Sequence, residues 1–128
     1  MLELSLTEAL RRVEAALGLT YPASFHAGAH ALVALSATSG FQRAFPATRL
    51  LLDVEETRNA RRQVHGRLVP FMYSEAQHPD IYAFEPGPAG SEPKVVVWCV
   101  HTTVYEWPDF SRFMSWVNQL CDRGLASK

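Results

Sequence analysis

The stretch 94–100, KVVVWCV, constrains the fold more than any other part of the sequence, because it is apolar at every position after its lysine. Successive side chains of a strand point to opposite faces, so such a strand must be covered on both. Two apolar runs precede it, LVPFMY (68–73) and IYAFE (81–85), and TTVYEW (102–107) follows. Turn-forming segments, SEAQHPD and PGPAGSEP, separate the first three runs. We therefore expect 94–100 to be a central strand of a sheet built from consecutive strands.

Helical periodicity and capping residues surround these strands. Ser5-x-x-Glu8 and Asp53-x-x-Glu56 have the spacing of capping boxes, and Pro22 suits a first helical turn. Apolar residues then recur at helical spacing after each start. We expect helices over about 6–17, 22–36 and 54–64, and a last helix that Asp109 caps and Gly124 ends.

The segments between these elements carry weaker signals. The content of Ser, Thr, Gly and Pro predicts a loop over 36–48, with Gly40 as its turn residue. Residues 50–52 predict a short strand. Pro70 cannot donate a backbone hydrogen bond, so the strand at 68–73 is expected to be bulged or at an edge. An open edge there would allow a homodimer.

The order of elements is therefore helix, helix, strand, helix, three or four strands, helix. Consecutive strands predict an α+β fold, with a largely antiparallel (mixed) sheet of four to six strands. The N-terminal helices, the middle helix and the C-terminal helix would pack on this sheet. The length of 128 residues fits one domain spanning 1–128.

Composition predicts a cytoplasmic protein that contacts neither nucleic acid nor a membrane. The net charge is −1, which gives no general attraction to nucleic acid. No apolar run approaches the roughly 20 residues that a membrane helix needs. The start, MLELSLTEAL, lacks the cationic region of a signal peptide. Cys99 and Cys121 lie in apolar patterns and are expected to be reduced, buried side chains.

Residues with catalytic or metal-binding chemistry are sparse. His26 and His30 have the spacing of zinc peptidase ligands, but Ala27 stands where that chemistry needs a glutamate base. The strand period places Cys99 and His101 on one side, yet a thiol nucleophile also needs an orienting group and an oxyanion site. We expect no catalytic residue, no metal and no cofactor. A composite zinc site of these histidines and the thiol, or a small thiol enzyme, is the alternative.

Charge is divided unevenly along the chain. Residues 43–67 hold six arginines against three acids, whereas residues 68–110 hold six acids against Lys94 alone. Aromatic residues, including Tyr105, are mixed with these acids, and the combination suits recognition of a basic protein. The predicted partner-binding residues are Tyr73, Glu75, Asp80, Tyr82, Glu106, Trp107 and Asp109. The alternative is that Tyr82 and Trp107 are core residues and the acids only solubilise the surface.

The order and spacing of these motifs, over about 5–120, resemble the SUKH superfamily, which includes fungal regulators of cell-wall glucan synthesis and many bacterial immunity proteins. The chain departs from that pattern in having Ser39-Gly40 where Asn-Gly is common, and SEAQHPD where the turn is often glycine-rich. The residues that carry the resemblance are Tyr21-Pro22 with Phe25, Ser39-Gly40, the run LLLDVEE at 50–56, Val69-Pro70-Phe71, Asp80 with Tyr82 and Phe84, the valines at 95–97, and Ser111 with Phe113 and Trp116.

The resemblance implies a non-enzymatic domain that binds other proteins. In bacteria, many such domains are immunity partners that neutralise a cognate toxin, often a nuclease. The acidic region at 68–110 would then face a basic toxin. A general protein-interaction module in cell-envelope or secretion regulation is the alternative that the resemblance leaves open.

Overall fold

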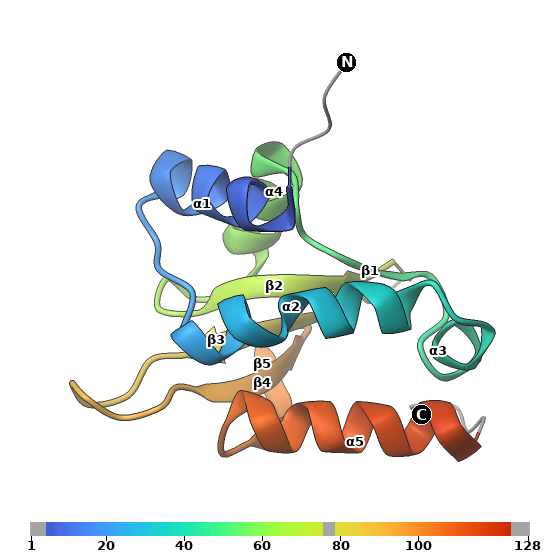
Figure 1. The fold of residues 1–128 in the computed structure, drawn as a ribbon. Coiled ribbons are helices and arrows are strands. Elements are labelled where there is room, and N and C mark those ends of the chain that lie inside the picture. The colour runs from blue at the N-terminus through green and yellow to red at the C-terminus, as the bar shows by residue number, and fades with distance from the viewer. Residues whose placement is uncertain (1–4, 76–78, 124–128) are drawn as a thin grey trace.

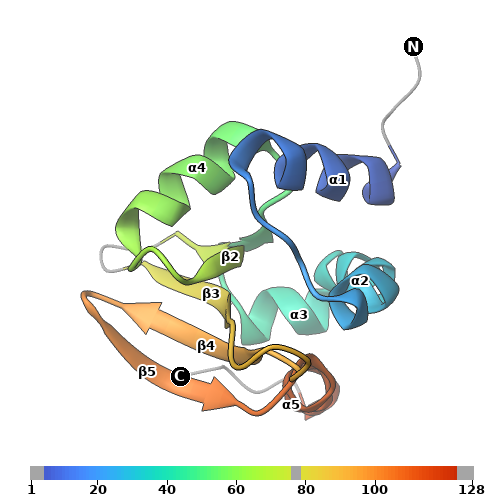
Figure 2. The ribbon, with the colours of Figure 1, turned by 90° about the vertical axis from the view of Figure 1, so that its left-hand side faces the viewer.

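A computed structural model describes residues 5–75 and 79–123, which form a five-stranded antiparallel sheet with helices on both faces (Figures 1 and 2). The strands are hydrogen-bonded in chain order, from β1 to β5. The predicted α+β class, with N-terminal, middle and C-terminal helices on the sheet, is confirmed. The helices are α1 (Leu6–Leu17), α2 (Ala23–Ser36), α3 (Ser39–Ala44), α4 (Val54–Gln63) and α5 (Phe110–Arg123), and the strands are β1 (Thr48–Leu50), β2 (Val69–Ser74), β3 (Asp80–Glu85), β4 (Lys94–Cys99) and β5 (Thr102–Trp107).

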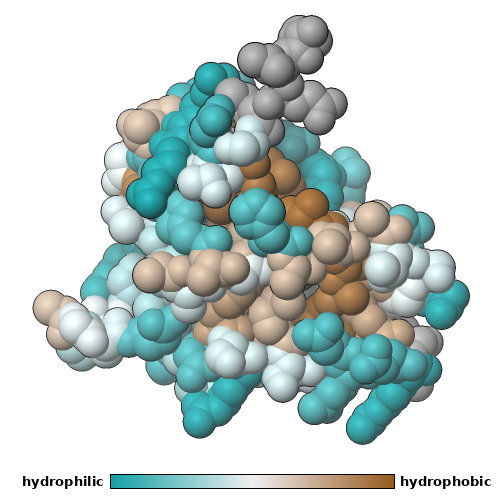
Figure 3. Space-filling view, in the orientation of Figure 1, coloured by the Kyte–Doolittle hydropathy of each residue, from teal (hydrophilic) through white to brown (hydrophobic). Residues whose placement is uncertain are grey.

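The two faces of the sheet are covered by different helices. We call the face covered by α2, α3 and α5 the α5 face, and the opposite face, covered by α4, the α4 face (Figures 1 and 2). α1 contacts both α4 and α2 and so joins the two layers. α2 is apolar on most sides, and apolar atoms reach the surface where it lies, between the more hydrophilic α1 and α5 (Figure 3).

Phenylalanine rings fill the core of the α5 face. The ring centroids of Phe71 and Phe84, on neighbouring strands, lie 4.6 Å apart, and Phe25 from α2 and Phe110 from α5 pack against both. Contacts of this kind bring large apolar areas together with favourable ring geometry. The α4 face has a smaller core, in which Ile81 is joined by small and aliphatic residues of β3, β4 and α4.

β4 is covered on both faces, as the sequence predicts. Val95 and Val97 pack in the core of the α5 face, and Val96 packs in the core of the α4 face. β4 is internal, although β3 occupies the middle of the sheet. Coverage of β4 ends at Val97, because Trp98 and Cys99 are only half-buried.

Most predicted helix boundaries are confirmed by their caps. Ser5 accepts a hydrogen bond from the backbone N–H of Glu8, and Asp53 accepts one from Glu56. Gly18 ends α1 in the left-handed conformation, at φ 63°. The predicted end of the last helix, Gly124, lies outside the described residues.

The loop predicted over 36–48 is wrong, because it contains the short helix α3. The hydroxyl of Thr38 caps α3 by accepting from the N–H of Phe41 at 3.2 Å, so a residue that favours loops acts here as a helix cap. Gly40 lies inside α3 and makes no turn. A Cβ atom at this position would lie 2.8 Å from the carbonyl oxygen of Cys121, so the glycine permits close packing of α3 on α5.

The first two strands also differ from the prediction. The short strand covers 48–50 instead of 50–52, and it pairs with residues 72–74 of β2. β2 is therefore internal, and the open edge that we expected to support a homodimer is occupied by β1. The bulge expected at Pro70 is confirmed, because the register between β2 and β3 shifts between Pro70 and Met72.

A buried carboxylate connects α1 to α2. Glu14 is 9% exposed, and its Oε2 accepts from the backbone N–H of Tyr21 at 2.8 Å and lies 3.0 Å from Nε2 of His26. The hydroxyl of Tyr21 donates to the carbonyl of Pro70 at 3.1 Å. Burial, and then the charge of Glu14, raises the pKa of the Tyr21 hydroxyl well above its usual range. His26 thus takes part in a structural network.

Replacing Gly40 with alanine tests the contact between α3 and α5. The added Cβ would force α5 away, and this cost exceeds the gain in helix propensity, so we expect a loss of about 1–2 kcal/mol in the free energy of unfolding. Urea denaturation measures it. Gly66→Ala is the matched control, because nothing lies within 4 Å of its Cβ position, and it should change stability by less than about 1 kcal/mol. Equal effects would contradict the proposed packing role.

Replacing Tyr21 with phenylalanine tests the buried hydroxyl. At pH 8 the variant should lose about 1 kcal/mol with the hydrogen bond to Pro70. The pKa of this hydroxyl is raised in the folded protein, whereas in the unfolded chain it is about 10. The contribution of the hydroxyl to the free energy of unfolding is therefore complete below about pH 10 and is lost as pH rises further. The stability gap between the two proteins should therefore narrow above about pH 10. Urea unfolding from pH 8 to 11.5 measures this gap, and a constant gap would exclude the linkage.

Candidate protein-binding surface

The exposed large hydrophobic side chains of the described residues all lie on the hairpin formed by β4 and β5. They are Val100, Val104 and Tyr105, with 53%, 48% and 63% of their surface exposed. Single exposed apolar residues are ordinary, but a cluster of them on one element indicates an interaction surface. Figure 2 shows β5 as the outer strand, with the hairpin tip projecting beyond the helices. We call residues 94–107 the β4–β5 hairpin.

The tip of the hairpin is conformationally strained. Cys99 pairs with Thr102, so Val100 and His101 form a two-residue turn, with φ angles of 45° and 73°. Turns with two positive φ angles favour Asn-Gly, and a β-branched valine is a rare occupant that costs roughly 1–2 kcal/mol. The turn holds an exposed valine in an unfavourable conformation, and such strain is often found at functional sites.

The prediction that Cys99 and His101 lie on the same side of a strand is wrong, because the alternation of the strand stops where this turn begins. Cys99 lines a hollow on the α5 face, whereas His101 lines another on the α4 face. Cys99 and Cys121 are both only half-buried, so the expectation of buried cysteines is also wrong.

The hollow on the α5 face has a volume of about 240 Å³, and we call it the tyrosine hollow. A bulge opposite β4 leaves Val104 as an extra residue of β5, and both Val104 and Tyr105 line the hollow. Burial, and then the charge of Asp80, raises the pKa of the Tyr82 hydroxyl well above its usual range. The lining residues are Asp80, Tyr82, Val97, Cys99, Val104, Tyr105 and Trp116.

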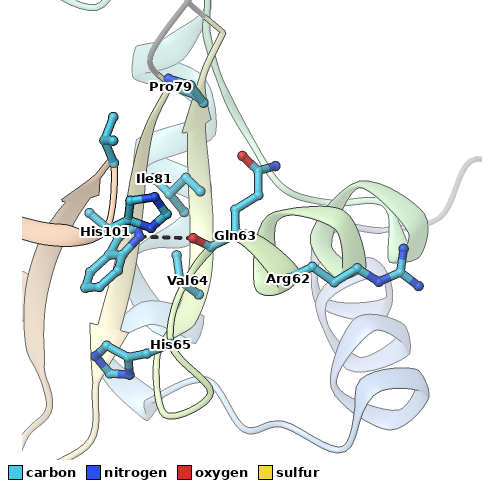
Figure 4. A pocket seen from close by; sticks show the side chains of 9 residues that line it. Arg62, Gln63, Val64, His65, Pro79, Ile81 and His101 are labelled. Carbon is cyan, nitrogen blue, oxygen red and sulfur yellow. Dashed lines mark hydrogen bonds between the residues drawn. The ribbon is translucent and has the colours of Figure 1, made fainter.

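The hollow on the α4 face has a volume of about 560 Å³ and lies between the end of α4 and the hairpin tip (Figure 4). The indole Nε1 of Trp98 donates to the carbonyl of Gln63 at 3.0 Å, and the ring of His65 meets the indole edge-on at 5.2 Å. These contacts fix Trp98 in one orientation. His101 also lines this hollow, and Figure 4 shows the side chain of Arg62 pointing away from it. The two hollows flank the hairpin on opposite faces of the sheet.

The seven residues predicted to bind a partner do not form one surface. Asp80 and Tyr82 are buried, with 5% and 4% of their surface exposed, and both line the tyrosine hollow. Tyr73 and Glu75 line a separate hollow near α4. There the guanidinium of Arg49 lies 5.3 Å from the centroid of the Tyr73 ring and 3.2 Å from Glu75.

The other three predicted residues have structural contacts. Glu106 lies 3.7 Å from Lys94. Trp107 packs against Phe113 and Trp116 at the margin of the core. This agrees with the alternative interpretation, in which Trp107 is a core residue. Asp109 accepts from the N–H of Arg112 at 2.8 Å and so begins α5, as predicted.

Sequence reasoning missed the contributions of Val100 and Val104, and noted Tyr105 without selecting it. The available signal was that TTVYEW is the last strand of a consecutive series, because the last strand of a meander lies at an edge. Within 5–75 and 79–123, no group of three or more His, Cys, Asp or Glu side chains is arranged to hold a metal ion. Nor is any helix of this part of the chain long and apolar enough to cross a membrane.

The structure defines an α+β domain in which the exposed large apolar side chains of the described residues lie on the two faces of the β4–β5 hairpin, at one edge of the sheet. No known protein family model matches the chain, and no curated protein or solved structure is significantly similar to it.

Replacing Val100-His101 with Asn-Gly tests the strain at the hairpin tip. Both new residues tolerate positive φ, so the double variant should gain about 1–2 kcal/mol in the free energy of unfolding. The control is Val100→Ala with His101→Ala, which trims the side chains but retains a Cβ at each strained position, and should give no such gain. Urea denaturation measures both, and equal stability of the two double variants would show that the turn is unstrained.

Proposed function

We propose that this chain is a non-enzymatic protein-binding domain, and that it acts as an immunity protein of the SUKH type that neutralises a cognate toxin by direct binding. The observation that carries the proposal is the clustering of Val100, Val104 and Tyr105 on one strained hairpin. The class of function comes from the motif resemblance, and the hairpin supplies the surface. We place the protein in the cytoplasm, where a toxin that attacks nucleic acid would be met.

The hairpin suits a polypeptide partner for two physical reasons. Among the described residues, no strand pairs with the outer edge of β5, so its backbone groups are free to pair with an added strand. The hollows on either side of the hairpin would accept anchoring side chains, which dominate the affinity of protein interfaces. The bulge at Val104 limits how many backbone hydrogen bonds an added strand would form.

A basic toxin is the partner that charge favours. Residues 68–110 carry six acids against one lysine, and opposite charge accelerates the encounter of two proteins. Ion pairs with Arg49 and Lys94 partly neutralise Glu75 and Glu106. Charge would therefore mainly raise the rate of association, whereas the apolar side chains of the hairpin would supply most of the affinity.

Binding to toxins encoded beside the gene tests the proposal. The wild-type chain should protect cells that express its cognate toxin and should form a complex with it. Tyr105→Ala and Val104→Ala should each weaken the complex about tenfold or more, because exposed anchors of this kind contribute roughly 1–2 kcal/mol or more. Affinity is measured by calorimetry, and protection by survival on induction of the toxin.

Two variants serve as controls in this experiment. Gln42→Ala changes an exposed residue of α3 and should leave affinity unchanged. Tyr73→Ala reports on the separate hollow near α4, so a complex weakened by Tyr73→Ala but not by Tyr105→Ala would contradict the hairpin as the site. A complex without protection would favour a general interaction module. Absence of both complex and protection would exclude the immunity role.

A further inference from the structure

We propose that the tyrosine hollow binds the guanidinium group of an arginine side chain presented by a partner protein. This inference deepens the proposed function, on which it rests for the source of the arginine. A small guanidinium compound can be tested for binding to the hollow directly, so this experiment needs no toxin.

The walls of the hollow are aromatic and come from three elements. Tyr82 is on β3, Tyr105 on β5 and Trp116 on α5. The faces of tyrosine and tryptophan rings carry negative electrostatic potential and attract cations, and arginine is the side chain most often found over them. The remaining wall includes Val97 and Val104, which suit the aliphatic stem of a long cationic side chain.

The lining of the hollow carries a negative charge, which attracts a cation. Asp80 contributes a carboxylate, and no basic side chain is among the described residues that line the hollow. The carboxylate of Asp80 has contacts of its own, and its charge acts through space on a cation in the hollow. Because Asp80 is buried, its field is screened less by solvent than that of a surface acid.

A related combination of one tyrosine ring and two carboxylates holds an arginine elsewhere in this molecule. The guanidinium of Arg49 lies 5.3 Å from the Tyr73 ring centroid. Its Nε and NH1 atoms lie 3.1 Å and 3.2 Å from carboxylate oxygens of Glu56 and Glu75. The tyrosine hollow likewise combines tyrosine rings with an acid, and no arginine is among the described residues that line it. A partner would supply it.

Access and size are consistent with one side chain. Tyr105 is 63% exposed and Val104 is 48% exposed, so the hollow opens beside the outer edge of β5. Its volume of about 240 Å³ is below that of typical small-molecule pockets, which are roughly 300–1,000 Å³. One anchoring side chain therefore suits it better than a cofactor or a metabolite.

Titration with n-butylguanidinium tests the inference, and n-butylurea is the control because it is a neutral compound of nearly the same shape. Two-dimensional NMR of the ¹⁵N-labelled protein follows the indole N–H signal of Trp116, assigned with Trp116→Phe. We expect saturable shifts of this signal with butylguanidinium. Butylurea should bind about 2- to 30-fold more weakly, the range that a cation–π contact contributes.

Two substitutions locate the binding site. Tyr105→Leu retains an apolar wall but removes an exposed ring, and should weaken butylguanidinium binding about 2- to 30-fold. The matched control, Tyr73→Leu, removes a ring whose face Arg49 already covers, and should leave binding unchanged. The dispersion of the remaining NMR signals verifies that each variant is folded.

Three results would overturn the inference. They are equal affinities for the charged and neutral compounds, shifts centred on the Trp98 indole in place of Trp116, and the absence of saturable shifts. The toxin experiment is independent of these results. A toxin complex that forms in a protein without guanidinium binding would refute this inference and leave the proposed function standing, whereas guanidinium binding without any toxin complex would refute the proposed function alone.

Discussion

Two-sided burial of β4 is the constraint on which the rest of the structure depends. Val95 and Val97 face one core and Val96 faces another, so the sheet needs helices on both sides. α5 and α2 cover one face, and α4 covers the other. Each buried valine stabilises the fold by about 1.5–3 kcal/mol relative to an exposed one, so exposing either face would remove a large part of the stability of a small domain.

The candidate surface begins where this coverage ends. Beyond Val97 the strand passes through the half-buried Trp98 and Cys99 to a turn that lies in solvent. Among the residues that the structure describes, exposed large apolar side chains and a valine at positive φ occur only at this hairpin. The fold tolerates this strain of about 1–2 kcal/mol because β4, which leads into the turn, is buried in the cores of both faces.

The two hollows on either side of the hairpin differ in chemistry. On the α4 face, Trp98 is fixed by Gln63 and His65, so its indole is a rigid element of the wall. On the α5 face, aromatic rings surround a region that contains one acid. A partner that contacts both hollows would bind the hairpin on both of its faces. The shape of the hairpin as well as its charge would then determine which partner binds.

Local signals in the sequence determined most of the elements, because caps, strand alternation and helical periodicity depend on near neighbours. Ser5, Asp53 and Asp109 each cap the helix that they predict, and the valines at 95–97 are covered on both faces. Only the tertiary structure decided which strands lie at the edges and which residues share a surface. β1 pairs with β2, and β5 is the other edge strand among the described residues. Gly40 meets α5 across the molecule, and a bulge places Val104 and Tyr105 in the same hollow as Tyr82. These relations join residues far apart in the chain, and their energies arise from packing that no local pattern encodes.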